Sequence, residues 1–148
     1  MSQRRSDGAG FVFARFQDRH GPLPAALLTT VFFWLFHVPS FNVETRSWST
    51  TALVLGIFLL PHAGSRLITG WLYNRAGCSV LIAGLFHSMH NAIVNPTGLV
   101  AVVGLPQFEV LVIMAGIVVL AAAIIAVATR GRLGVKRPES DADLTNAG

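Results

Sequence analysis

Residues 108–129, FEVLVIMAGIVVLAAAIIAVAT, decide the fold class of this chain. Apart from Glu109 near its start, the stretch contains no charged side chain. A helix that crosses the hydrocarbon core of a bilayer needs roughly 20 mostly apolar residues. The stretch is long enough and apolar enough to meet that need, and it therefore predicts a transmembrane helix.

Three more windows contain no Asp, Glu, Lys or Arg, namely residues 20–43, 47–65 and 76–108. The sequence of 148 residues is 53% hydrophobic and only 12% charged, whereas soluble domains carry about 25% charged residues. We therefore expect an all-α fold, a polytopic helical membrane protein with about four transmembrane helices and a short N-terminal interfacial helix.

Prolines indicate where these helices begin and end. Pro22 suits the first turn of a helix, and the residues before Pro39 and Pro96 are restricted away from helical geometry. Within a helical membrane domain of residues 10–129, the expected spans are about 23–38, 50–73, 79–94 and 108–129. We expect residues 1–9 to be disordered and residues 130–148 to form a basic and then disordered cytoplasmic tail.

Basic residues gather at the edges of the apolar windows. Arg15 and Arg19 precede the first span, Arg75 follows the second, and Arg130 and Lys136 follow the last. Lys and Arg mark cytoplasmic flanks, so both termini are expected to be cytoplasmic, in a bacterial-type cytoplasmic membrane. A nucleic-acid-binding protein would show a basic face with stacking aromatics, so we expect the lipid bilayer as a partner and no nucleic acid.

Two histidines lie inside apolar stretches, His37 at the end of VFFWLFH and His87 at the end of LIAGLFH. Ionisable side chains at membrane depth are costly and usually face a cavity or a partner. His87 shares a helix face with Asn91. Neutral imidazole is a common zinc ligand, and an amide can donate to an oxyanion, so a buried polar site is one interpretation. The alternative interpretation is that each of these two histidines is a hydrogen-bonded packing residue. His90 is expected to be a packing residue, and His20 and His62 are expected to lie near the interface or a kink.

The two site histidines are predicted at different depths. Counted from Leu23, His37 lies about 14 residues along its helix, or roughly 21 Å at 1.5 Å per residue. Counted from Ser79, His87 lies about 8 residues along its helix, or roughly 12 Å. A tilted or deep-set third helix would bring the two side chains level.

The order of the motifs is informative. GFVFARFQDRHGPLPAALL (residues 10–28) is followed by Phe33-x-x-x-His37, and GWLYNRAG (residues 70–77) precedes His87-x-x-x-Asn91. Over about residues 10–95, the sequence resembles the CPBP family of intramembrane metalloproteases, also called Abi or CAAX-protease and bacteriocin-processing proteins.

This resemblance implies a membrane metalloendopeptidase that hydrolyses peptide bonds of membrane-associated or prenylated-type substrates. It implies catalytic roles for His37, His87 and Asn91, with Asn91 stabilising the oxyanion. It also implies a divalent metal ion, zinc, held by His37 and His87, and a peptide or protein substrate as a partner.

The sequence departs from the family at its first motif, Glu-Glu-x-x-x-Arg. By position the arginine falls on Ala9 and the two glutamates fall on Arg4 and Arg5. Catalytic zinc normally has three protein ligands, so two histidines leave the site incomplete, and the general base is missing as well. We therefore expect a truncated or inactive family member, with no peptidase activity for residues 1–148 alone.

Two other functions stay open. The fold could be retained by a non-catalytic membrane protein with a binding or regulatory role, which the missing carboxylates favour. His37 and His87 could also be the axial ligands of a haem, which would need two helices that face each other across a wide slot.

Overall fold

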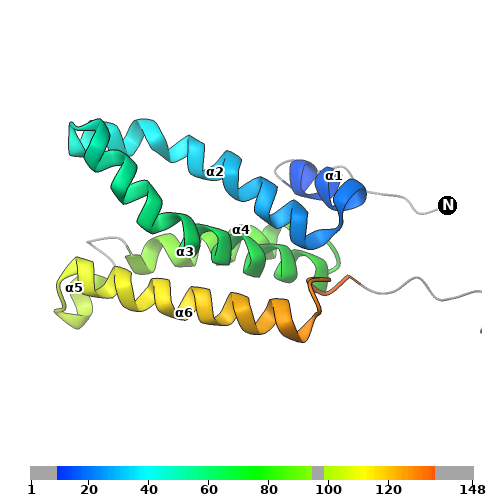
Figure 1. Cartoon of the computed structure of the whole chain (residues 1–148). Helices are drawn as coiled ribbons and strands as arrows, with labels where there is room; N and C mark the ends of the chain where they lie inside the picture. The colour runs from blue at the N-terminus through cyan, green and yellow to red at the C-terminus, as the bar shows by residue number, and fades with distance from the viewer. Residues whose placement is uncertain (1–9, 95–98, 136–148) are drawn as a thin grey trace, which may run out of the picture.

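The chain forms a helical bundle in which α3 is central. The computed structural model describes residues 10–94 and 99–135, and within them every regular element is a helix. α3 packs against α2, α4 and α6, and α1 packs against α2 (Figure 1). The helices are α1 (Gly10–His20), α2 (Pro22–Thr45), α3 (Trp48–Arg75), α4 (Val80–Val94), α5 (Leu99–Val103) and α6 (Gln107–Ala128).

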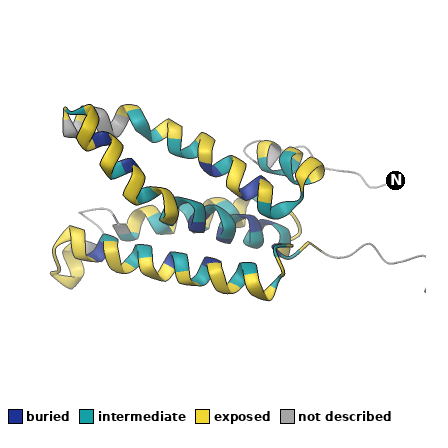
Figure 2. Cartoon of the chain, viewed as in Figure 1, coloured by how far each residue is buried: buried dark blue, intermediate teal, exposed yellow. Residues whose placement is uncertain are grey.

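The surface of the bundle suits lipid. Three helices are long and apolar enough to cross a membrane, with spans at Pro22–Pro39, Trp48–Arg75 and Gln107–Ala128, and α4 is a shorter apolar helix. Exposed positions follow the outer sides of these helices (Figure 2), and large apolar side chains such as Leu53 and Leu120 are 65% and 63% exposed. Soluble proteins rarely expose large contiguous apolar patches. The prediction of an all-α, polytopic membrane protein is confirmed.

Helix α2 does not stop at its proline, in contrast to the sequence-based expectation. Its apolar span ends at Pro39, but the helix continues to Thr45 with Pro39 inside it. A proline removes one backbone N–H from the helix, and membrane helices accommodate that loss. The chain turns only at Arg46, which has a φ of 52°.

The structure describes only some of the other segments whose bounds the sequence predicts. Between the expected spans at 79–94 and 108–129, the structure contains the short helix α5. The expected disorder of residues 1–9 and of residues 136–148 lies outside the described residues.

The contact between α3 and α6 is close because Gly64 lies in it. A Cβ atom on Gly64 would come within 3.1 Å of Cγ1 of Val118 and 3.5 Å of the Cβ of Ala122. Small residues let membrane helices approach each other in this way. Ile68, one turn later, joins the same buried cluster. Arg66 lies halfway between Gly64 and Ile68 in sequence, so at 100° per residue it lies on a different face of α3 from these two residues.

A polar contact closes the end of the bundle at which α3 ends. Gln17 and Asn74 exchange two amide hydrogen bonds, 3.0 and 2.9 Å long, and the Asn74 amide also donates to the carbonyl of Leu133 at 2.9 Å. The side chain of Leu133 is fully buried. These three residues, the amide cluster, tie α1 and the turn after α6 to the end of α3.

Candidate functional site

His37 is oriented by its own helix. Its Nδ1 donates to the carbonyl oxygen of Phe33, one turn earlier, at 2.7 Å, and the two ring centroids are 4.7 Å apart. A carbonyl oxygen only accepts hydrogen bonds, so Nδ1 carries a proton. In the neutral ring the lone pair therefore lies on Nε2, the nitrogen that can take up a proton or bind a metal ion.

His87 and Asn91 lie on one face of α4, as their spacing predicts. The Nε2 atom of His87 and the Nδ2 atom of Asn91 are 3.1 Å apart. His87 is half-buried and Asn91 is exposed. The pair is therefore placed at the border of the bundle, where a side chain can contact both the interior and a molecule outside it.

The ring of Phe33 links the two predicted site histidines. Its centroid lies 4.7 Å from that of His37 and 5.3 Å from that of His87. The sum of these two distances is an upper limit on the separation of the two imidazoles, so both belong to one cluster. His87 meets the ring of Phe33, one turn before His37, so this ring bridges much of the depth difference expected from the sequence. His37, His87 and Asn91 line one cavity of about 420 Å³.

Sequence reasoning missed His62, which it placed near an interface or a kink. His62 follows Pro61 on α3, and both line the same cavity. The centroids of His62 and His37 are 5.2 Å apart. Its Nδ1 donates to the carbonyl of Phe58 at 2.7 Å, so its lone pair also lies on Nε2 when the ring is neutral.

A repeated sequence pattern was the available signal for His62. A phenylalanine stands four residues before four of the five histidines. The pairs are Phe16–His20, Phe33–His37, Phe58–His62 and Phe86–His90, with ring centroids 6.5, 4.7, 6.4 and 6.3 Å apart. His90, expected to be a packing residue, stacks on Phe86 and also lines the cavity. The pattern selects the exposed His20 and omits His87, so it does not identify a site by itself.

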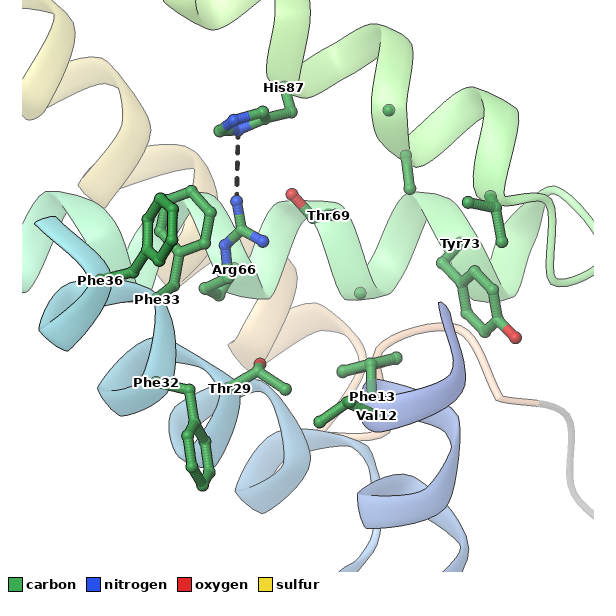
Figure 3. A pocket seen from close by; sticks show the side chains of 14 residues that line it. Val12, Phe13, Thr29, Phe32, Phe33, Phe36, Arg66, Thr69, Tyr73 and His87 are labelled. Atoms are coloured by element: carbon green, nitrogen blue, oxygen red, sulfur yellow. Dashed lines mark hydrogen bonds between the residues drawn. The ribbon is translucent and has the colours of Figure 1, made fainter. Parts of the chain in front are cut away.

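Arg66 is the second residue that sequence reasoning left without a role. It donates through Nη2 to Nδ1 of His87 at 3.3 Å (Figure 3), and its Cζ lies 4.0 Å from the centroid of the Phe33 ring. Arg66 is the only charged residue between Arg46 and Arg75. That isolation in an apolar window was the signal that could have found it. We call Phe33, His37, His62, Arg66 and His87 the histidine cluster.

The contact with Arg66 fixes the proton on His87. A guanidinium only donates, so Nδ1 of His87 must accept. A neutral imidazole has one lone pair on its ring nitrogens, so Nε2 then carries the proton. The Asn91 amide consequently meets this N–H with its oxygen, in the orientation that exchanges Oδ1 and Nδ2. While Arg66 holds it, neutral His87 has no nitrogen lone pair for a metal ion.

The metal ion expected at His37 and His87 does not fit the described residues. No aspartate or glutamate is among the described residues that line the cavity. Residues 10–94 and 99–135 contain no group of three or more His, Cys, Asp or Glu that could hold a metal ion. Because catalytic zinc normally needs three protein ligands, this part of the chain does not complete a metal site.

The fold and the cavity define a helical membrane protein with a histidine-lined pocket between its spans. A family model described as type II CAAX prenyl endopeptidase, Rce1-like, matches residues 9–93, which is more than half of the chain. The chain therefore belongs to this CAAX protease family, which confirms the resemblance seen in the sequence. A comparison with curated proteins and one with solved structures found no match. The matched residues run from α1 nearly to the end of α4 and include the whole histidine cluster.

Proposed function

We propose that this chain carries the histidine part of a CAAX-type endopeptidase site. Its substrates would be membrane-associated polypeptides of the prenylated type, cleaved by hydrolysis of one peptide bond. The observation that carries the proposal is the contact of one ring, Phe33, with both His37 and His87, beside a cavity that Asn91 also lines. Family membership supports the reaction class.

The side chains have separable roles in this reaction. In the absence of a metal ion, His37 would offer the lone pair of Nε2 as the acceptor for a proton from the attacking water; a bound metal ion would occupy that lone pair instead. Asn91 supplies an amide that donates to the oxyanion of the tetrahedral intermediate. Binding of a divalent ion such as zinc by His37 and His87 would require further ligands and the release of His87 from Arg66. We therefore expect residues 1–148 alone to show no peptidase activity.

Restoring the first family motif tests the proposal. The variant Arg4→Glu, Arg5→Glu, Ala9→Arg places Glu-Glu-x-x-x-Arg at the positions that match the family. We expect this variant, in lipid nanodiscs, to cleave a farnesylated CAAX peptide in the presence of zinc, with product detected by mass spectrometry. The matched control is Arg4→Gln, Arg5→Gln, Ala9→Arg, which removes the same cations and adds no carboxylate.

Two results would contradict parts of the proposal. Cleavage by the unaltered chain that disappears in His37→Ala would show that the chain needs no restored motif. A folded, restored variant that cleaves no prenylated peptide would argue against a peptidase site at His37 and His87.

A non-catalytic role in binding or regulation is the second candidate. The absence of a carboxylate among the described lining residues and the contact between Arg66 and His87 favour it. A haem held by His37 and His87 is less compatible with the geometry, because the Phe33 ring already contacts both imidazoles. A haem absorption band in the purified protein would revive that alternative.

We also propose a bacterial-type cytoplasmic membrane as the location, with both termini in the cytoplasm. In support, the first and last described residues lie at the same end of the bundle (Figure 1). Basic residues gather at this end, including Arg75 at the end of α3 and Arg130 after α6, as expected for a cytoplasmic flank.

A further inference from the structure

A second cavity adjoins the histidine-lined one. Its volume is about 550 Å³, and it shares Phe33, Arg66 and His87 with the first cavity. Most of its other lining is aromatic, aliphatic or glycine, from α1 to α4. Figure 3 shows Arg66 reaching from α3 toward His87, with the rings of Phe33 and Phe36 to one side of it. The guanidinium therefore stands where an apolar cavity meets a polar one.

Among the residues that the structure describes, the positive charge of Arg66 has no negative partner at this junction. A guanidinium stays charged in proteins. Its contacts are the neutral face of Phe33 and a ring nitrogen of His87, and no aspartate or glutamate is among the described residues that line either cavity. A charge at this depth is costly without a partner, and a cation–π contact offsets only part of that cost. The junction is therefore a site at which an anion would be stabilised.

The apolar cavity reaches side chains on the lipid-facing surface of the bundle. Its lining comes from α1, α2, α3 and α4. Phe32 and Phe36, which line it from α2, are 60% and 77% exposed, and in a bilayer these rings contact acyl chains. A ligand that reaches Arg66 by this route must itself be soluble in the bilayer.

We propose that Arg66 binds the carboxylate of a long-chain fatty acid, whose apolar chain lies in the cavity beside Phe33 and Phe36. The guanidinium pairs with the carboxylate through two parallel N–H···O hydrogen bonds. The cavity, at about 550 Å³, is within the range of roughly 300–1,000 Å³ that is usual for small-molecule sites. This site goes beyond hydrolysis, and binding to it does not require peptidase activity.

Fluorescence titration with cis-parinaric acid tests the proposal. The probe is a polyunsaturated fatty acid that accepts energy from tryptophan, and the chain contains three tryptophans. The full chain in neutral detergent should give saturable energy transfer. Hexadecanoate should displace the probe, whereas methyl hexadecanoate, which lacks the charge, and acetate, which lacks the chain, should not. Equal displacement by the ester or by acetate would overturn the proposal.

Two pairs of variants distinguish binding of the carboxylate head group from binding of the acyl chain of the fatty acid. Arg66→Gln should weaken binding about tenfold or more, because a charge-assisted pair is lost. Arg75→Gln, a cation that lines neither cavity, should bind as the unaltered chain does. Gly84→Leu should also weaken binding about tenfold, because Gly84 lines the apolar cavity and has open space around its Cβ position. Gly116→Leu on α6, with equal space and no place in either cavity, is its control.

The variants also give results that would overturn the proposal of a fatty-acid site. Circular dichroism and gel filtration establish that each variant is folded. If a folded Arg66→Gln binds the probe like the unaltered chain, Arg66 is not the head-group site. If Gly84→Leu and Gly116→Leu bind it equally, the chain of the fatty acid does not occupy the cavity. The comparison of acid with ester uses the unaltered protein, so it decides the charge requirement even if a variant does not fold.

Discussion

The amide cluster and the histidine cluster lie on the same helix, and they handle polarity in opposite ways. In the amide cluster, Asn74 gives and receives hydrogen bonds in a closed exchange with Gln17 and also donates to Leu133. In the histidine cluster, Arg66 only donates, and among the described residues it donates to the imidazole of His87. The first arrangement is satisfied by the fold itself, whereas the described residues that line the two cavities supply no acid to balance the charge of the second.

This difference teaches which cluster supports structure and which is open to chemistry. Buried polar groups that are fully paired stabilise one conformation. Ionisable groups inside a membrane that lack such pairing are usually functional. We therefore expect substitutions in the amide cluster to act on stability, and substitutions in the histidine cluster to act on activity and binding.

The largest effect should appear as lost catalysis. In the chain with the restored motif, His87→Ala should lower kcat/KM about 10²-fold or more, as expected for loss of an acid–base or ligand residue. Asn74→Ala should leave kcat/KM per folded molecule within about threefold, since it removes no group from the cavity. Peptide cleavage rates, normalised to folded protein, make the measurement. Equal losses in both variants would erase the distinction between the clusters.

The next effect is on stability. Asn74→Ala should lower the free energy of unfolding by about 2–4 kcal/mol, because Gln17 and the carbonyl of Leu133 lose their partner. Asn91→Ala, at an exposed asparagine, should cost less than about 1 kcal/mol. Denaturant titration in detergent, followed by circular dichroism, compares the two. A larger loss for Asn91→Ala would reverse the assignment of roles.

A smaller effect is expected for the charge at the histidine cluster. Arg66→Met keeps an apolar stem of similar length and removes a cation that has no acidic partner. The free energy of unfolding should stay within about 1 kcal/mol of the original value or rise, as when buried charges are replaced by apolar residues. The same titration measures it. A loss of more than about 2 kcal/mol would mean that Arg66 is a structural residue like Asn74.

The last prediction concerns the side of the membrane on which the amide cluster lies, and it involves no change in stability or activity. Cys78, the single cysteine of the chain, is exposed in the turn after α3, close to Asn74 in sequence. If this end of the bundle is cytoplasmic, a membrane-impermeant maleimide should label Cys78 only after cells are permeabilised. Cys78→Ser is the blank. Labelling of Cys78 in intact cells would show that this end of the bundle faces the outside and would contradict the proposed topology.

Much of the fold follows from the sequence because a bilayer imposes a simple rule. Charge-free windows of sufficient length become helices, and three helices of the structure are long and apolar enough to cross a membrane. Pro39 was misread as a helix end. Local restrictions on backbone angles do not decide whether a helix in lipid stops, since the cost of leaving the backbone without hydrogen bonds there is high.

The site was harder to predict than the fold. His37, His87 and Asn91 were found through motif order, and the structure brings them to one cavity, while their catalytic roles stay predictions. His62 and Arg66 were missed because α3 is apolar nearly all round, so its sequence does not show which face meets α2 and α4. Tertiary contacts fix that rotation, among them the close approach of Gly64 to Val118.

The carbonyl contacts of His37 and His62 have a consequence for how the cavity can diversify. Each ring donates to the main chain of its own helix. Neighbouring residues can therefore be exchanged without moving the proton from Nδ1, and the basic edge of each ring keeps its direction. Mutation of the other lining residues can therefore give such a pocket new ligands, while the two proton acceptors keep their positions.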